Sequence, residues 1–455
     1  MLLPTPTDLR AMSRLALPVV TVQVGIMTMG VADTVMVGHV SARALASVAL
    51  GNLYFYVVGV FGMGVLMALD PVVAQAVGAR DEEAIARAVQ RGLAIVLALT
   101  IVSSLVLYPG AVVMTALRQP AEVIPDAARY ARICIPGVLP YFAFIVFRQS
   151  LQAMGRVAPI VVTVIVANAC NVLLNWALIF GHAGMPGLGV SGAAWATTIS
   201  RWIMALLLLA LASRQLRAHL APLRQASLAA EPLARMARLG VPIGLQYMLE
   251  YGAFAVTALL MGLIGTHEMA AHQIAINLAS LTFMVPFGVS AATAVLVGQA
   301  IGEGDEQRAR RAASAGMLCG VGFMVIFGIV FTVAPRMLAG FYTRDATVLA
   351  LAATLLPIAG LFQVFDGTQT VAAGILRGAG DTHAPMAINV LGFWLIGLPA
   401  SAWLAFRGGL GAEGLWWGFV AGLGSVALLL VLRVRTRMRR EMRRVVIDRG
   451  FGIGD

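Results

Sequence analysis

Long apolar runs, bounded by Arg, Gly or Pro, follow one another along almost the whole chain. The runs are continuous rather than alternating with a period of two, and they approach or exceed the about 20 residues that a membrane-spanning helix requires. Reading them between these boundaries predicts twelve spans, at approximately 11–36, 46–77, 84–108, 126–150, 157–181, 189–213, 235–264, 269–300, 310–333, 346–375, 385–406 and 411–434. Several spans are longer than a bilayer needs, so we expect tilt or protrusion into water. The pattern predicts an all-α polytopic membrane protein.

The second half of the chain repeats the first. The residues that recur at a spacing of 224 are Pro18/Pro242, Gln75/Gln299, Gly78/Gly302, Asp81/Asp305 and Gly92/Gly316. Gly155 recurs as Gly380 at 225, and the segment 189–195 resembles 411–417 at 222. A nearly constant offset across six spans predicts two six-helix halves of the same topology, which are parallel repeats. Asp81 and Asp305 each open a short acidic run before a helix, where we expect them to act as N-caps.

The repeat gives the expected domain organisation. We expect an N-lobe over residues 1–213 with spans 1–6, a cytoplasmic linker over 214–234, a C-lobe over 235–434 with spans 7–12, and an Arg-rich cytoplasmic tail over 435–455. The N-terminal twenty residues contain no small-residue cleavage site before the first run, so we expect no removable signal peptide.

Composition and charge agree with membrane insertion. Of 455 residues, 60% are apolar and 12% are charged, whereas soluble proteins carry about 25% charged residues. All 32 basic residues are Arg and the net charge is +11. Placing the N-terminus inside puts 24 Arg on the cytoplasmic side and seven on the other, with Arg201 alone inside a span. This asymmetry predicts that both termini are cytoplasmic, and it explains the basic excess without nucleic acid.

Four carboxylates lie inside the predicted spans: Asp33, Asp70, Glu250 and Asp366. An ionised side chain at the bilayer centre costs at least about 2.5 kcal/mol, so such a group faces a polar cavity, binds a proton or holds a cation. Desolvation favours the protonated form of a carboxyl group, whereas a bound cation favours the ionised form. A buried acid can therefore exchange H⁺ or Na⁺ for a cationic ligand, which is the elementary step of an antiporter.

The first span carries Asp33, and the fifth carries Asn168, Asn171 and Asn175. Asn171 and Asn175 are one turn apart on one helix face. Their carbonyl oxygens could join the Asp33 carboxylate in an oxygen cage for Na⁺ or a hydrated proton. Alternatively, the Asn side chains serve only as hydrogen bonds between helices, and Asp33 forms only an ion pair or a hydrogen bond near the outer interface.

The second group of acids lies in the other half of the chain. Tyr247 and Tyr251 flank Glu250 on the seventh span, and Phe362 and Gln363 precede Asp366 on the tenth. Aromatic faces beside buried carboxylates suit flat lipophilic cations, although aromatic residues in spans more often only pack. Asp70 lies near the cytoplasmic end of its helix, where a structural role is favoured.

Other chemistries find no support. The histidines show no metal-ligand spacing, and the three cysteines lie within apolar runs. No phosphate-binding loop occurs, so ATP is not expected to drive this chain. We expect no cofactor, no metal beyond Na⁺, and H⁺ or Na⁺ as the coupling ion.

Several segments are specific enough to suggest a family. The segments MVGHVSARALASVALG, GVLMALDPVVAQAVGA, AHQIAINLASLTFMVPFGVSAATAVLVGQAIGEGD and AAGILRGAGDT resemble the multidrug and toxic compound extrusion family, NorM-type branch. The resemblance covers essentially all twelve spans. It implies a V-shaped pair of six-helix lobes and H⁺- or Na⁺-coupled export of cationic drugs such as fluoroquinolones, ethidium-like dyes and aminoglycosides. It also implies that Asp33, Asn171 and Asn175 form an N-lobe cation site and that Glu250 and Asp366 are the C-lobe acids.

One residue departs from the family pattern. The family's cation-coordinating Tyr, one turn before the C-lobe Asp, is Phe362 in this chain. A phenyl ring offers no oxygen ligand, so the departure favours the N-lobe site, or proton coupling, over Na⁺ coordination in the C-lobe.

The leading hypothesis is a secondary drug/cation antiporter of a bacterial inner membrane, acting by alternating access as a monomer among membrane lipids and conferring antibiotic resistance. A lipid-linked oligosaccharide flippase of the same superfamily is the main alternative, although its cleft would be lined with basic rather than acidic residues. A membrane-embedded enzyme would need clustered catalytic groups, and a channel would show no stoichiometric coupling. The sequence leaves the coupling ion, the drug spectrum, the physiological substrate, the oligomeric state and the roles of Asp70 and Arg201 open.

Overall fold

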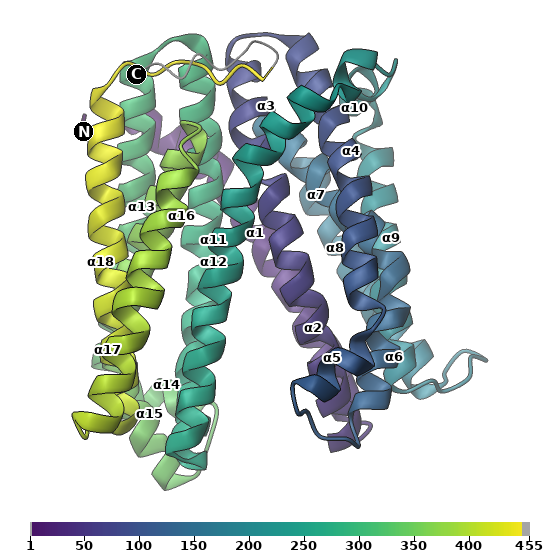
Figure 1. Cartoon of the computed structure of the whole chain (residues 1–455), viewed down its shortest axis with the longest axis vertical. Coiled ribbons are helices and arrows are strands. Elements are labelled where there is room, and N and C mark those ends of the chain that lie inside the picture. Colours follow the sequence, from purple (N-terminus) through teal and green to yellow (C-terminus); the bar gives the residue numbers. More distant parts are fainter. Residues whose placement is uncertain (1, 448–455) are drawn as a thin grey trace. The chain divides into compact units, whose positions relative to one another are not determined.

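A computed structural model describes residues 2–447, and all regular secondary structure within this range is helical. Twelve helical stretches in this range are long and apolar enough to cross a membrane, which confirms the predicted spans. Figure 1 labels the helices in chain order. The end of the predicted tail, residues 448–455 with Arg449, lies outside the described residues.

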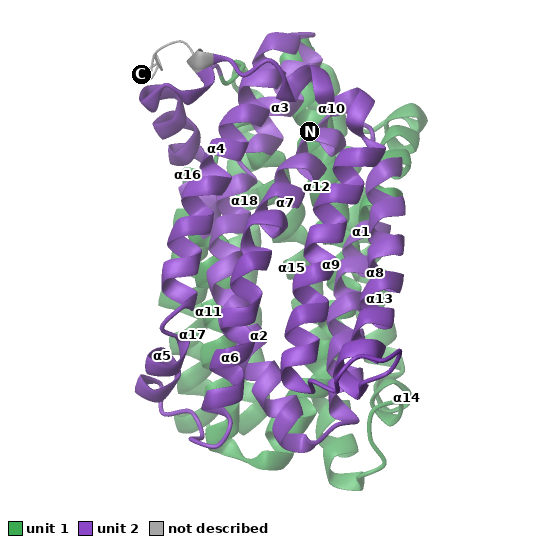
Figure 2. Ribbon diagram, turned by 90° about the vertical axis from the view of Figure 1, so that its right-hand side faces the viewer, with its two compact units in different colours: residues 1–20, 245–445 green, residues 21–244, 446–455 purple. Residues whose placement is uncertain are grey.

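The helices form two compact units, which Figure 2 colours separately. Within the described residues, unit 1 comprises 2–20 and 245–445, and unit 2 comprises 21–244 and 446–447. Two helices contribute to both units. Helix α1 (Pro6–Gly38) changes unit after Val20, and helix α11 (Ala230–Ile264) changes unit after Gly244. These two positions are 224 residues apart, which is the spacing of the sequence repeat.

Unit 2 contains the helices that follow α1, as far as the beginning of α11. They are α2 (Ala42–Leu66), α3 (Leu69–Gly78), α4 (Glu82–Leu107), α5 (Gly110–Ala116), α6 (Ile124–Cys134), η1 (Ile135–Gly137), α7 (Val138–Ala153), α8 (Ala158–Phe180), α9 (Val190–Leu211), α10 (Ser213–Leu220) and η2 (Gln225–Leu228). The predicted second span is thus two helices, because the backbone turns at Met67 and Ala68.

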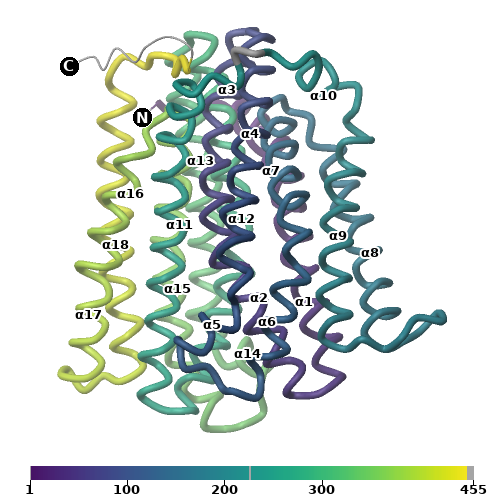
Figure 3. The backbone as a smooth tube through the Cα atoms, turned by 45° about the vertical axis from the view of Figure 1, so that its right-hand side comes forward, coloured from purple at the N-terminus to yellow at the C-terminus, as the bar shows by residue number. Residues whose placement is uncertain are grey.

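Unit 1 contains the remaining helices. They are α12 (Thr266–Glu303), α13 (Glu306–Val333), α14 (Pro335–Gly340), α15 (Ala346–Gly378), α16 (His383–Asn389), η3 (Val390–Gly397), α17 (Leu398–Ala402), η4 (Trp403–Arg407) and α18 (Gly411–Arg439). The eleventh span is therefore an interrupted helix, with π-helical turns at η3 and η4. It packs along α18, and Figure 3 follows the two segments side by side.

Residues that recur in the two halves have the same local role in both. Asp81 caps α4 by accepting a hydrogen bond from Ala84 N at 3.0 Å, and Asp305 caps α13 by accepting one from Arg308 N at 2.8 Å. This confirms the predicted N-caps. The recurring glycines at 155 and 380 have φ of 71° and 75°, a left-handed conformation that favours Gly. The recurring residues are therefore ones that the local backbone needs, either to cap a helix or to adopt a left-handed conformation.

Small residues let the helices of each unit approach closely, as is common in membrane proteins. A Cβ atom on Gly418 of α18 would lie 2.2 Å from Ser401 N of α17. A Cβ atom on Gly64 of α2 would lie 2.5 Å from the Cα atom of Gly244 on α11. Backbone contacts of this kind fix the spacing of helices within each unit.

Candidate functional site

The predicted N-lobe residues come together inside unit 2. Asp33 on α1 is 4% exposed, and Asn171 and Asn175 on α8 are completely buried. Asn175 Nδ2 donates a hydrogen bond to Asp33 Oδ1 and another, of 3.2 Å, to Asn171 Oδ1. The three side chains thus form one hydrogen-bonded group, which we call the N-lobe site.

The third asparagine of α8 does not belong to this group. Asn168 Nδ2 donates to Gly25 O at 2.9 Å and to Val164 O at 2.8 Å, so it joins α8 to the backbone of α1. Asn168 therefore forms a hydrogen bond between helices, which is the alternative role considered for the asparagines of this span. In the N-lobe site, the carbonyl oxygen Oδ1 of Asn175 is buried and accepts no hydrogen bond within residues 2–447. A free carbonyl oxygen beside a carboxylate is the kind of ligand that a hard cation prefers.

Helix α9 supplies two residues near Asp33 that the sequence did not single out for this role. Thr197 Oγ1 lies 3.0 Å from Asp33 Oδ2 and 3.0 Å from Ala193 O of its own helix, so its single hydrogen can serve either acceptor. Arg201 lies one turn further along α9, close enough for its charge to act on the Asp33 carboxylate. Its guanidinium carbon is 3.7 Å from the centroid of the Phe55 ring, a cation–π contact that holds the positive charge beside the acid.

The C-lobe acids come together inside unit 1. Glu250 on α11 and Asp366 on α15 share one donor, because Gln369 Nε2 lies 2.9 Å from Glu250 Oε1 and 3.3 Å from Asp366 Oδ1. Trp394 of η3 packs against the same turn of α11, where its Nε1 donates to Leu249 O at 3.1 Å. We call Glu250 and Asp366 the C-lobe pair.

The neighbours predicted for the C-lobe pair lie in different surroundings. Tyr247 is hydrogen-bonded to Arg377, with 3.2 Å between its hydroxyl oxygen and Arg377 Nη1. Gln363 is buried and its Oε1 accepts a 2.6 Å hydrogen bond from the Thr282 hydroxyl. Tyr251 on α11 is half-buried. These three residues are therefore polar groups of the same unit as the two acids.

Phe362, where the family has a tyrosine, belongs to a cluster of aromatic rings. Its ring centroid lies 6.0 Å from that of Phe254, 5.5 Å from Trp416 and 5.9 Å from Phe419. The side chain is 1% exposed. Edge-to-face packing of this kind stabilises the helices around it, and it gives the ring a packing role beside the acid one turn later.

The fourth buried acid occupies a different position. Asp70 is fully buried in the first turn of α3, directly after the break in the second span. The helix dipole favours a negative charge at this end of a helix. Arg148, from α7 of the same unit, is also buried and donates to Gln23 Oε1 at 3.0 Å.

The N-lobe site and the C-lobe pair give each unit carboxyl groups whose chemistry suits a proton or a cation. The N-lobe site has one carboxylate with amide and hydroxyl groups around it, which suits a small cation or a proton. The C-lobe pair brings two carboxylates to a single amide, so it can hold up to two negative charges and neutralise an organic cation or take up protons. Among residues 2–447, no three His, Cys, Asp or Glu side chains gather as ligands for a tightly bound metal.

Comparison with known proteins identifies the family. The MatE family model matches the chain twice, at residues 18–177 and 242–403. The chain belongs to the MatE family. The two matches begin 224 residues apart, which confirms that the chain consists of two homologous halves. MatE proteins are transporters, so the alternative of a membrane-embedded enzyme is set aside.

Curated relatives extend this similarity over almost the full length. A protein of Rhizobium meliloti named "Probable multidrug resistance protein NorM" is 37% identical over 96% of this chain and 95% of its own. A protein of the same name from Pseudomonas putida is 39% identical over 95% of this chain and 96% of its own. The crystal structure of a eukaryotic MATE transporter has the same fold, with a TM-score of 0.88 and 23% identity, over 97% of this chain and 99% of that one. The protein is thus a multi-pass membrane protein with the MATE fold.

Proposed function

We propose that this MatE protein is a secondary active multidrug antiporter. It exports lipophilic, cationic drugs by alternating access, in exchange for H⁺ or Na⁺. The observation that carries the proposal is the presence of an acid site in each half: the N-lobe site with buried Asp33 in unit 2, and the C-lobe pair of buried Asp366 and half-buried Glu250 in unit 1. The names of the NorM relatives support multidrug resistance as the biological role.

The two sites differ in the cation that they suit. The N-lobe site has a single carboxylate and a free carbonyl oxygen from Asn175, so we assign the coupling ion to it. The C-lobe pair has two carboxylates, which can bind an organic cation or take up protons. Because Phe362 has no oxygen atom, Na⁺ at the C-lobe pair would lack the oxygen ligand that the family tyrosine provides.

The proposal includes a location and an orientation. The protein lies in the inner membrane of a bacterium with both termini in the cytoplasm, since that orientation places 24 Arg on the cytoplasmic side and seven on the other. It acts as a monomer.

Transport in reconstituted vesicles tests the proposal. Purified protein in liposomes should move ethidium when a pH gradient or a Na⁺ gradient is imposed separately, and only the coupling ion should give movement against the ethidium gradient. Ethidium movement that ignores both gradients would contradict antiport. Movement of a lipid-linked oligosaccharide, without movement of ethidium, would favour the flippase alternative.

A further inference from the structure

Helix α18 of unit 1 presents one continuous stripe away from the unit. The residues of its other face, among them Trp416, Leu423 and Leu430, are fully buried. On the outward face, Leu428 is 61% exposed and Leu432 is 46% exposed. Because these positions follow the helical spacing of three and four residues, they belong to one stripe. In a membrane-crossing helix an exposed apolar stripe contacts the acyl chains of lipids.

The stripe changes from apolar to basic at its C-terminal end. The exposed positions after Leu432 are Arg433, Arg435, Thr436, Arg439 and Arg440. Trp417, 42% exposed, marks the other end. Eighteen residues separate Trp417 from Arg435, a rise of about 27 Å in an α-helix, and the hydrocarbon core is about 30 Å thick. When Trp417 lies at one membrane interface, where tryptophan is enriched, Arg435 lies at the level of the lipid headgroups.

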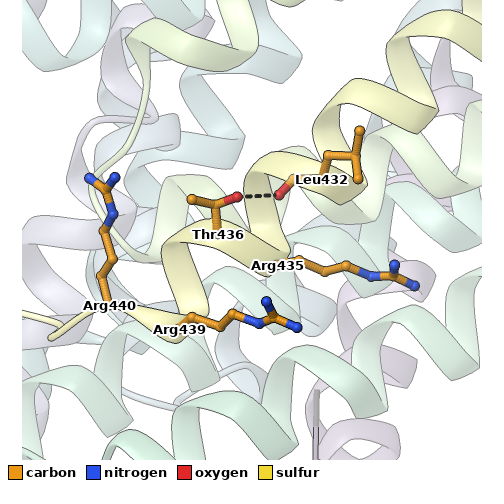
Figure 4. A pocket seen from close by; sticks show the side chains of 5 residues that line it. All are labelled: Leu432, Arg435, Thr436, Arg439 and Arg440. Carbon is orange, nitrogen blue, oxygen red and sulfur yellow. Dashed lines mark hydrogen bonds between the residues drawn. The ribbon is translucent and has the colours of Figure 1, made fainter.

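The basic end of the stripe lines an open recess of about 400 Å³, shown in Figure 4. Leu432, Arg435, Thr436, Arg439 and Arg440 are its lining residues. The Thr436 hydroxyl donates to Leu432 O at 2.9 Å, so its only hydrogen is used within the helix and its oxygen lone pairs remain available. No carboxylate is among the lining residues.

These arginines differ from the other arginines around the end of α18. Arg433 pairs with Asp381, Arg437 donates to Glu441 O, and Arg443 pairs with the Glu441 carboxylate. Arg435, Arg439 and Arg440, by contrast, have no ion pair or side-chain hydrogen bond within residues 2–447. Arg435 and Arg439 are one turn apart, where like charges repel, so an anion that binds between them relieves this repulsion.

We propose that this recess binds the phosphate headgroup of an anionic glycerophospholipid, with the acyl chains lying along Leu432 and Leu428. The planar guanidinium groups of Arg435 and Arg439 donate paired hydrogen bonds to phosphate oxygens. The apolar stripe directly below the arginines selects a ligand that carries both a phosphate and acyl chains. A soluble phosphate compound would match only the arginines of the site and not its apolar residues. The proposal goes beyond drug transport and does not depend on it.

Thermal unfolding of the purified full-length protein in detergent, with added lipid, tests the proposal. Dioleoyl phosphatidylglycerol should raise the Tm by several degrees, whereas the zwitterionic dioleoyl phosphatidylcholine should not. The triple variant R435Q/R439Q/R440Q should lose this increment. The matched control R336Q/R344Q/R407Q removes three other exposed arginines of the same unit and should keep it. Native mass spectrometry should show at least one phosphatidylglycerol molecule retained by the wild type and by the control, and its loss from the triple variant.

Three results would overturn the proposal. The first is equal stabilisation of the wild type by phosphatidylglycerol and phosphatidylcholine. The second is a triple variant that keeps the full increment and the retained lipid. The third is the same increment from glycerol 3-phosphate at matched concentration, which would assign the recess to a soluble phosphate instead. Size-exclusion chromatography and the Tm in phosphatidylcholine establish that the variant is folded, so a misfolded variant cannot be mistaken for loss of lipid binding.

Discussion

Replacement of Asp33 by Asn removes the charge of the N-lobe site while the hydrogen bonds around it can re-form. The new Oδ1 can still accept from Asn175 Nδ2. The new Nδ2 can donate to Thr197 Oγ1, whose own hydrogen can go to Ala193 O at 3.0 Å. Hydrogen bonds to a charged group contribute about 1.5–3 kcal/mol, against about 0.5–1.5 for neutral ones. For two bonds the loss is about 2–3 kcal/mol, and it is offset because an ion is no longer buried. We expect the Asp33→Asn protein to fold.

The effect on ion binding should be much larger than the effect on folding. A carboxylate about 4 Å from a monovalent cation attracts it by about 4 kcal/mol at an effective dielectric constant of about 20. Because 1.4 kcal/mol corresponds to a tenfold change, losing this attraction should weaken ion binding by about a thousandfold. Ion-driven transport should therefore fall to the rate seen without a gradient.

The assay measures both quantities on the same preparation. Thermal unfolding reports whether the variant is folded, and ethidium movement in liposomes under a pH or a Na⁺ gradient reports coupling. Asp305→Asn is the matched control, because Asn caps a helix as well as Asp does and the cap on α13 should persist. That control should transport like the wild type.

Two results would refute this reasoning about Asp33. If Asp33→Asn keeps the ion-driven rate of the wild type, the acid is dispensable for coupling. If the variant is absent from the membrane or unfolds far below the Asp305→Asn control, the carboxylate is structural.

Three further variants probe the two sites and the packing around them. Gln369→Leu removes the donor that the C-lobe pair shares, and each of the two hydrogen bonds contributes about 1.5–3 kcal/mol to the charged form of an acid. The protonated form should then be favoured, so ethidium affinity at neutral pH should fall at least tenfold. Unchanged affinity in an equilibrium binding titration would contradict this. Arg201→Met removes the positive charge beside the N-lobe carboxylate, so the concentration of coupling ion at half-maximal transport should fall; an increase would show that Arg201 does not oppose the ion. Gly418→Ala places a Cβ atom 2.2 Å from the Ser401 backbone and should lower stability by about 1–3 kcal/mol, measured as Tm, whereas Gly322→Ala, where nothing lies within 4 Å, should not.

The sequence was informative where a pattern has few physical explanations. Twelve long apolar runs can cross a bilayer only as twelve helices. The spacing of the sequence repeat equals the distance between the two segments that match the family model. Asn171 and Asn175 could be placed on one helix face because they lie one turn apart, and the family resemblance implied that they join Asp33.

Two contacting residues escaped sequence reasoning for different reasons. Thr197 in an apolar helix ordinarily bonds its own backbone, and it does so here through Ala193 O. Nothing in the sequence therefore distinguishes it from a packing residue. Gln369, in contrast, lies three residues after Asp366 and so on the same helix face, which is a signal that could have marked it. The unit boundaries within α1 and α11 follow from packing, which a repeat pattern does not encode.

The change of unit within α11 has a consequence for how such a chain could have arisen. Unit 2 includes α11 only as far as Gly244, and the close contact of Gly64 with that glycine belongs to this unit. A half-length ancestor that ended before α11 would have lacked this covering segment in its own sequence. The first helix of a second copy could have supplied it, since Val20 and Gly244 are equivalent positions of the repeat. Two such copies would have exchanged their N-terminal helix segments as a domain-swapped dimer, and gene fusion would have made the exchange permanent within one polypeptide.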